Sequence, residues 1–179
     1  MNNQILITHP APDEYPEWFA GEIDLVHYPD LITGLDDMQI QTLSLLQNLS
    51  EEQLLFRYAE GKWTIKEMWQ HVLDVERILS YRALRFARGD KTVLPGFDHD
   101  GYAMVSQANQ RSWEGMLDEY KDIRRSTIRL FQSLTPEMAM QVGTAGRSVL
   151  TARAVGYLVV GHNIHHLETA KERYLKPLT

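Results

Sequence analysis

The 179-residue sequence predicts an all-α fold, a four-helix bundle preceded by an irregular N-terminal arm over residues 1–29. Four long segments carry apolar residues at intervals of three and four, the period that buries one face of a helix. Short or moderate connections between these segments favour helices packed side by side. Neither an internal repeat nor a linker divides the chain, so we expect a single domain over residues 1–179.

Proline placement predicts the irregular arm. Four of the seven prolines fall in the first 29 residues, and each fixes its own φ angle and lacks an amide hydrogen. We therefore expect at most one short helix in the arm, around residues 17–23. The first long helix is predicted over about residues 31–48, where apolar residues recur at threes and fours. Ser50, followed by Glu51 and Glu52, predicts a short helical turn after it.

The second long helix has the clearest start. Thr64 at the cap and Glu67 three residues later predict a capping box, in which each side chain accepts a hydrogen bond from the other residue's backbone amide. Trp63, just before the cap, can pack onto Met68. The apolar series continues until Gly89, so we expect this helix over about residues 64–88.

A loop and a third helix follow. Proline and glycine favour a connecting loop over residues 91–100. The third helix has a clear apolar series and ends before Pro136. Gly115 weakens its first turn, so its predicted start falls anywhere between residues 101 and 112.

The last part of the chain predicts a turn and a fourth long helix. Residues 141–150 contain two glycines and no helical period, which predicts a loop or a short hairpin. Thr151 can cap a helix that runs to about Tyr174.

Composition limits the kinds of reactive and metal-binding site that the chain can form and indicates its cellular compartment. The chain has no cysteine, which excludes disulfides, thiolate zinc sites, iron–sulfur clusters and a cysteine nucleophile, and leaves histidine and carboxylate side chains as metal ligands. The N-terminus lacks the basic start and apolar core of a signal peptide, and no run of about 18 apolar residues occurs. We expect a cytoplasmic protein with no membrane partner.

The charge pattern gives little support for nucleic-acid binding, and the net charge is −6. Two groups of basic residues follow helix faces, namely Arg82, Arg85, Arg88 and Lys91, and then Lys121, Arg124, Arg125 and Arg129. Acidic residues such as Asp118 and Asp122 are interspersed among them. We interpret both groups as solvated helix surfaces and expect no nucleic-acid partner.

Three of the seven histidines fall within one five-residue stretch of the last helix, residues 162–166. His162 and His166 are four residues apart and project from the same face, the geometry by which one helix offers two imidazoles to a single metal ion. Both continue an apolar stripe that should face the bundle interior. The alternative is a pair of core histidines satisfied by backbone or carboxylate groups.

His71 occupies a comparable place in the second helix, beside apolar residues on its buried side. If the second and last helices are neighbours, three imidazoles can converge on one divalent ion and leave a position open for water or substrate, as in catalytic sites. Asp74, one turn after His71, could orient that imidazole. A solvent-facing carboxylate is the alternative for Asp74.

Two other classes of metal site are disfavoured. A zincin requires His-Glu-x-x-His, but position 163 holds Asn163. A di-iron carboxylate bundle requires Glu-x-x-His on two helices, and no histidine here has Glu three residues before it. His165 points about 100° away from His166, so we expect it to be structural or to support the ligands. His99 could approach the open side of the site, and an exposed loop histidine is its alternative.

Three stretches in a fixed order resemble one family. They are Gly61-Lys62-Trp63-Thr64-Ile65-Lys66-Glu67 running into His71 and Asp74-Val75-Glu76-Arg77, then Ala87-Arg88-Gly89-Asp90 with Leu94-Pro95-Gly96-Phe97-Asp98, then Gly161-His162-Asn163-Ile164-His165-His166. Over about residues 30–179 the chain resembles the DinB superfamily, in particular its YfiT-like branch. The ordered combination is much more specific than any single motif.

The resemblance implies an up-down-down-up bundle with a divalent metal, commonly zinc or nickel, on three histidines. Carried over by position, these ligands are His71, His162 and His166. Family members are often described as metal-dependent hydrolases, and characterised relatives include thiol S-transferases that use bacillithiol and an isomerase dependent on mycothiol. Relatives are often dimeric, so a homodimer is expected.

The leading hypothesis is a metal-dependent enzyme that activates the thiol of a low-molecular-weight cofactor, or a water molecule, for a small-molecule substrate. Thiol transfer is preferred over hydrolysis. Side chains that could contact an anionic thiol or substrate are Asn109, Arg111, Arg125 and Arg147. The rival is a non-catalytic metal-binding stress-response module, in which His99 or a carboxylate closes the coordination shell and no pocket is present.

Overall fold

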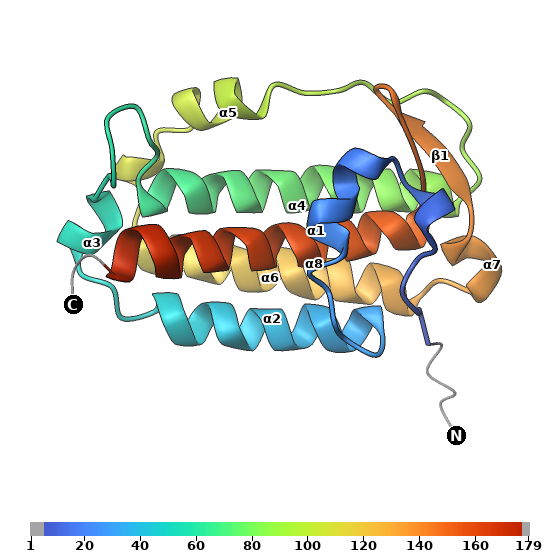
Figure 1. Ribbon diagram of the computed structural model, residues 1–179, viewed down its shortest axis with the longest axis horizontal. Coiled ribbons are helices and arrows are strands. Elements are labelled where there is room, and N and C mark those ends of the chain that lie inside the picture. Colours follow the sequence, from blue (N-terminus) through green and yellow to red (C-terminus); the bar gives the residue numbers. More distant parts are fainter. Residues whose placement is uncertain (1–5, 177–179) are drawn as a thin grey trace.

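Four long helices packed side by side form the body of the molecule (Figure 1). They are α2 (Leu31–Leu46), α4 (Ile65–Ala87), α6 (Trp113–Gln132) and α8 (Ala152–Thr169). The computed structural model describes residues 6–176, so the part of the predicted arm over residues 1–5 lies outside the described chain. The predicted all-α four-helix bundle is confirmed. None of the described helices is long and apolar enough to cross a lipid bilayer.

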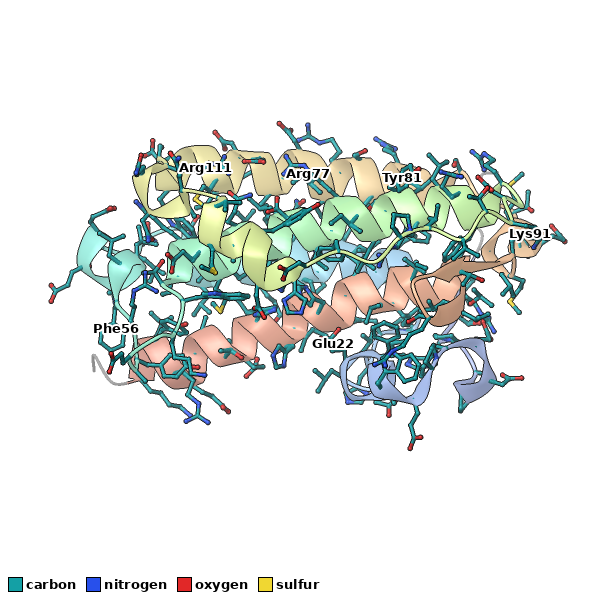
Figure 2. All side chains as sticks on the ribbon, turned by 90° about the horizontal axis from the view of Figure 1, so that it is seen from above. Glu22, Phe56, Arg77, Tyr81, Lys91 and Arg111 are labelled. Atoms are coloured by element: carbon teal, nitrogen blue, oxygen red, sulfur yellow. The ribbon has the colours of Figure 1, made fainter. Side chains whose placement is uncertain are left out.

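The four helices run up, down, down and up. In Figure 1, α4 and α6 point the same way, and α2 and α8 point the opposite way. α8 packs against α4 and α2, and α6 also packs against both. Because α4 and α6 are parallel, the chain between them must return along the bundle. This crossover carries α5 (His99–Val105) back over α4, as the view from above in Figure 2 shows.

The arm contains more helical structure than predicted. It holds η1 (Pro12–Glu14), η2 (Glu17–Phe19) and α1 (Ala20–Ile23). The last two cover the short helix predicted around residues 17–23, whereas the first turn was not predicted. The arm packs on α8, where Glu14 forms an ion pair with Arg153. Gly161 permits this packing, because a Cβ there would lie 2.1 Å from the carbonyl oxygen of Glu22.

The start signals predicted before α4 are confirmed. Ser50 caps the short helix α3 (Glu51–Leu55), and its hydroxyl accepts a hydrogen bond from the backbone amide of Gln53. Thr64 and Glu67 exchange both hydrogen bonds of the predicted capping box, at 2.8 and 3.1 Å. These bonds satisfy amide groups that would otherwise lack partners in the first turn of the helix.

The third helix differs from its prediction. α6 begins at Trp113, one residue after the predicted interval, and it is preceded by α5 and by η3 (Ala108–Gln110). Gln107 adopts the left-handed backbone conformation with φ 52°, which separates these elements. The prediction of a loop over residues 91–100 also extends two residues too far, because α5 begins at His99. The Asp98 carboxylate caps α5 by accepting an amide hydrogen of its first turn.

A short hairpin leads into the last helix. After α7 (Pro136–Ala139), strands β1 (Val142–Ala145) and β2 (Ser148–Thr151) pair antiparallel, which confirms the hairpin alternative for residues 141–150. The Thr151 hydroxyl then caps α8 by accepting a hydrogen bond of 3.1 Å from the amide of Ala154. Beyond α8 the backbone continues in the wider turns of η4 (Ala170–Leu175) and so reaches the predicted end near Tyr174.

One arginine predicted to lie on a solvated face is in the core. Arg124 is fully buried, whereas 71% of the side chain of its neighbour Arg125 is exposed. The surface prediction is therefore wrong at Arg124. Its guanidinium donates to both carboxylate oxygens of Glu76 on α4, each at 2.9 Å, and a charge with such a partner can be buried.

Candidate metal centre

Three histidine side chains from two neighbouring helices meet in the bundle. His71 comes from α4, and His162 and His166 come from α8. The Nε2 atom of His162 lies 3.0 Å from Nε2 of His71 and 3.1 Å from Nε2 of His166. Each residue offers one ligand atom, and these atoms all lie within 4.8 Å of one another. The predicted convergence of three imidazoles is therefore present.

The distances between the Nε2 atoms suit a single metal ion. Two nitrogens bound at 2.0–2.1 Å to a tetrahedral zinc ion stand about 3.4 Å apart, close to the distances between these Nε2 atoms. A neutral imidazole nitrogen either donates or accepts a hydrogen bond, so three crowded Nε2 atoms cannot all find partners in one another. A cation between them would accept all three lone pairs at once.

Burial keeps the three imidazoles neutral. Loss of solvation, reinforced by nearby histidines, lowers the pKa of His71 to about 4 and that of His166 to about 3. The pKa of His162 is also held well below its usual value, first by burial and then by the other two rings. A neutral imidazole carries the lone pair that a metal ion requires, so the group is ready to bind metal at neutral pH.

The metal-free protein is expected to lose stability as the pH falls from 6.5 towards about 4. In this interval the unfolded chain protonates these histidines and the folded protein does not. The unfolded state thus binds more protons, and the free energy of unfolding decreases with decreasing pH. Urea unfolding with a chelator at pH 7 and pH 5 measures the effect. His162→Gln should show a shallower dependence, and an unchanged dependence would contradict the assignment.

A pocket opens at the edge of the histidine cluster, beside His166. It has a volume of about 700 Å³, and its lining includes His166, Trp63, Met68 and Tyr174. The Trp63 ring also packs against the ring of His71, with 5.0 Å between centroids. The candidate ligands therefore adjoin an aromatic and apolar wall.

A second pocket of about 570 Å³ adjoins the first. Both include Gly61, Trp63 and Asp100 in their lining, and the second extends to Met104 of α5. α5 therefore contributes to the walls of this open region above α4. Open space beside the histidine cluster is the feature expected of an enzyme, whereas the non-catalytic alternative predicts a closed coordination shell and no pocket.

Two further histidines lie close to the ligand candidates. The exposed His165 ring lies 5.0 Å from the His166 ring and lines the larger pocket. The exposed His99 ring lies 5.6 Å from the His71 ring, and its Nδ1 is 3.3 Å from a carboxylate oxygen of Asp100. Among residues 6–176, neither histidine joins the group of converging ligand atoms.

Asp74 contacts other residues than the one it was predicted to orient. Its Oδ1 accepts a hydrogen bond of 2.9 Å from Gln70 and lies 3.8 Å from a guanidinium nitrogen of Arg77. In the described chain it forms no hydrogen bond with His71. The orienting role remains a prediction that these contacts do not support.

The four residues predicted as substrate contacts lie elsewhere. They are Asn109, Arg111, Arg125 and Arg147, and none lines either pocket. Arg111 and Arg77, both labelled in Figure 2, pair with Glu119. Arg147 stacks over the ring of Trp18, with 4.8 Å from its guanidinium carbon to the ring centroid.

Several residues that line the pocket were not predicted to belong to the site. Tyr58 and Lys62 precede α4, whereas Arg173 and Tyr174 lie in η4, so no local spacing connects the two groups. The Tyr174 hydroxyl joins them by donating a hydrogen bond of 2.7 Å to the Trp63 carbonyl. The available signal was the predicted packing of Trp63 on Met68, because both residues line the pocket.

Removing the metal is expected to weaken the fold without unfolding it at about 25 °C, because a chain of this length buries a large apolar core of its own. Far-ultraviolet circular dichroism of the chelated protein should retain most of its helical signal. Complete loss of that signal would show that the ion is required for folding, as in zinc fingers.

The chain is similar to a family model, to a curated protein and to a solved structure. The family model of the DinB superfamily matches residues 35–170. A protein of Oceanobacillus iheyensis, named as a candidate metal-dependent hydrolase, is 27% identical over 129 residues, which cover 70% of this chain and 73% of that protein. The solved structure of YfiT from Bacillus subtilis, described as a candidate metal-dependent hydrolase with an unusual four-helix bundle topology, has a TM-score of 0.72 and 16% identity. That match covers 82% of this chain and 85% of the other and shows a shared fold.

Proposed function

The chain belongs to the DinB superfamily, and from this premise we propose that it is a divalent-metal-dependent enzyme acting on a small molecule. The proposed metal ligands are His71, His162 and His166. The observation that carries the proposal is the convergence of three neutral imidazole nitrogens beside an open pocket. The descriptions of both relatives as candidate metal-dependent hydrolases support the same class of chemistry.

Zinc or nickel is the proposed ion. Imidazole nitrogen suits these metals, whereas calcium and magnesium prefer oxygen ligands. When bound, such an ion would supply positive charge that lowers the pKa of a thiol or a water molecule. The three histidines are neutral and leave that charge uncompensated, which favours an anionic ligand at the open position.

The pocket provides the binding surface. Its volume of about 700 Å³ lies in the range of small-molecule sites, which combine apolar walls with a few polar groups. Trp63 and Met68 supply apolar surface next to the histidines, and Tyr58, Lys62 and Arg173 add polar groups. These side chains can hold a substrate against the face of the site that the histidines leave open.

Thiol transfer is the preferred reaction. A free thiol has a pKa of about 8.5 and water one of about 15.7, so the same positive charge would deprotonate a thiol more completely than a water molecule near neutral pH. The position that holds the general-base Glu in zincins is Asn163, whose amide is buried in the core. Metal-dependent hydrolysis is the second candidate, favoured by the descriptions of the two relatives.

Cobalt substitution tests the proposed function. Adding a low-molecular-weight thiol to the Co²⁺-loaded protein should produce a sulfur-to-cobalt charge-transfer band, because thiolate is a soft ligand for an open metal position. Conjugation of that thiol to an electrophile should require metal and be lost in His71→Ala. The exposed arm variant His27→Ala should retain both signals.

Two other outcomes of the cobalt experiment would change the assigned function. Metal-dependent ester or amide hydrolysis without a thiol-dependent band, across several thiols, would replace the transferase assignment with a hydrolase. Neither response, in a protein with a fully coordinated metal, would support the non-catalytic module.

A further inference from the structure

A second cluster of polar side chains lies in the bundle core, and it joins all four long helices. Its members are Thr42 of α2, Glu76 of α4, Tyr120 and Arg124 of α6, and Asn163 of α8. Each of them is at most 3% exposed. Buried polar groups in such a place cost free energy unless their hydrogen bonds are made.

Arg124 is the centre of this cluster. Its Nε and Nη2 atoms donate to the two carboxylate oxygens of Glu76, each at 2.9 Å. Its Nη1 donates to the backbone carbonyl of Leu35 on α2 at 2.9 Å, and its Nη2 also donates to Oδ1 of Asn163 at 2.8 Å. One planar guanidinium thus fixes the positions of α2, α4 and α8 relative to α6.

Asn163 extends the cluster to the helix that carries two candidate ligands. Its Oδ1 also accepts a hydrogen bond of 2.7 Å from the Tyr120 hydroxyl, and its Nδ2 donates to the Thr42 hydroxyl at 3.1 Å. Asn163 directly follows His162, and consecutive helix residues point about 100° apart. Holding the Asn163 amide in the core therefore sets the direction in which His162 projects.

Apolar packing alone does not set this direction, because α8 is buried on all sides over residues 154–163. A helix without a polar face buries a similar apolar area at several rotations, and the close approach of Gly161 to the arm constrains α8 on one side. A network with one set of hydrogen-bond partners has one matching rotation, and buried polar groups are known to fix helix register in this way.

We propose that Arg124 is a positioning residue for the metal centre, which acts through Glu76 and Asn163 to hold His71 of α4 against His162 and His166 of α8. The proposal rests on the metal site of the proposed function. Arg124 contacts none of the three histidines in the described chain, so its effect is carried by the rotation and register of α4 and α8.

The test compares Co²⁺ affinity with fold stability. Replacing both partners, Glu76→Leu with Arg124→Met, removes the ion pair and leaves neither charge unpaired, and such replacements often preserve stability. We expect the double variant to fold and to bind Co²⁺ about tenfold or more weakly, the loss typical when groups that support ligands are removed. Its Co²⁺ absorption spectrum should also change, because the ligand geometry is altered. Asn163→Leu, which leaves the ion pair intact, should weaken Co²⁺ binding in the same direction.

A matched control lies one turn along the same helices. Ser80 of α4 and Thr127 of α6 share a hydrogen bond of 2.8 Å that does not involve α8. Ser80→Ala with Thr127→Val should therefore leave the Co²⁺ affinity and spectrum unchanged. Urea unfolding of each metal-free protein separates a loss of affinity from a loss of stability.

Wild-type affinity and spectrum in both the double variant and Asn163→Leu would overturn the proposal. So would an affinity loss in the control pair equal to that in the double variant, because the effect would then reflect general loosening of the bundle. Failure of the wild-type protein to bind Co²⁺ would instead overturn the metal site itself, which distinguishes the two claims.

Discussion

Replacing His162 with alanine is expected to abolish stoichiometric metal binding. Its Nε2 lies 3.0 Å from that of His71 and 3.1 Å from that of His166, so the substitution removes the nitrogen that lies next to both others. His71→Ala and His166→Ala should also lower metal content sharply. Affinity should fall more than about 100-fold, since even residues that merely support ligands contribute 10- to 100-fold. Elemental analysis after dialysis measures the metal content.

His165→Ala is the matched control for these variants. His165 is exposed and projects from a different face of α8, so most of the metal should remain when it is replaced. Stoichiometric metal retained in both His162→Ala and His166→Ala would contradict the proposed ligand set.

Replacing Arg124 alone with methionine is expected to cost about 3–5 kcal/mol in the free energy of unfolding. The substitution leaves the Glu76 carboxylate buried without its cationic partner, and the Leu35 carbonyl and Asn163 lose one hydrogen bond each. This cost is large compared with the total stability of a typical domain, about 5–15 kcal/mol. Urea unfolding of the metal-free protein measures it, and adding Glu76→Leu should restore most of the loss.

The neighbouring arginine provides the control. Arg125 is exposed, and its contact with Asp122 is a surface pair at 3.5 Å, so Arg125→Met should change the free energy of unfolding by no more than about 0.5 kcal/mol. Equal effects at the two positions would show that the buried pair does not stabilise the fold as its contacts indicate.

Much of the fold could be predicted because its signals are local. The capping box of Thr64 and Glu67 and the threonine cap of α8 each lie within a few residues of the helix that they start. Two adjacent arginines show what local signals cannot predict. Arg124 and Arg125 are alike in sequence, and the buried one is selected by Glu76, 48 residues away on another helix.

The candidate site was likewise only partly predictable from local signals. The pairing of His162 with His166 follows from helical spacing, whereas the approach of His71 depends on α4 and α8 being neighbours. The pocket could not be predicted, because its walls combine the segment before α4 with η4. The break at Gln107 was also missed, since its left-handed backbone has no glycine to indicate it.

Anomalous diffraction at the metal edge, on crystals of the zinc- or nickel-loaded protein, tests the central claim most directly. The three-histidine site predicts one peak at about 2.0–2.1 Å from the Nε2 atoms of His71, His162 and His166, with the position facing the pocket free of protein ligands. The absence of a peak there, or a shell closed by His99 or a carboxylate, would contradict an open catalytic metal centre.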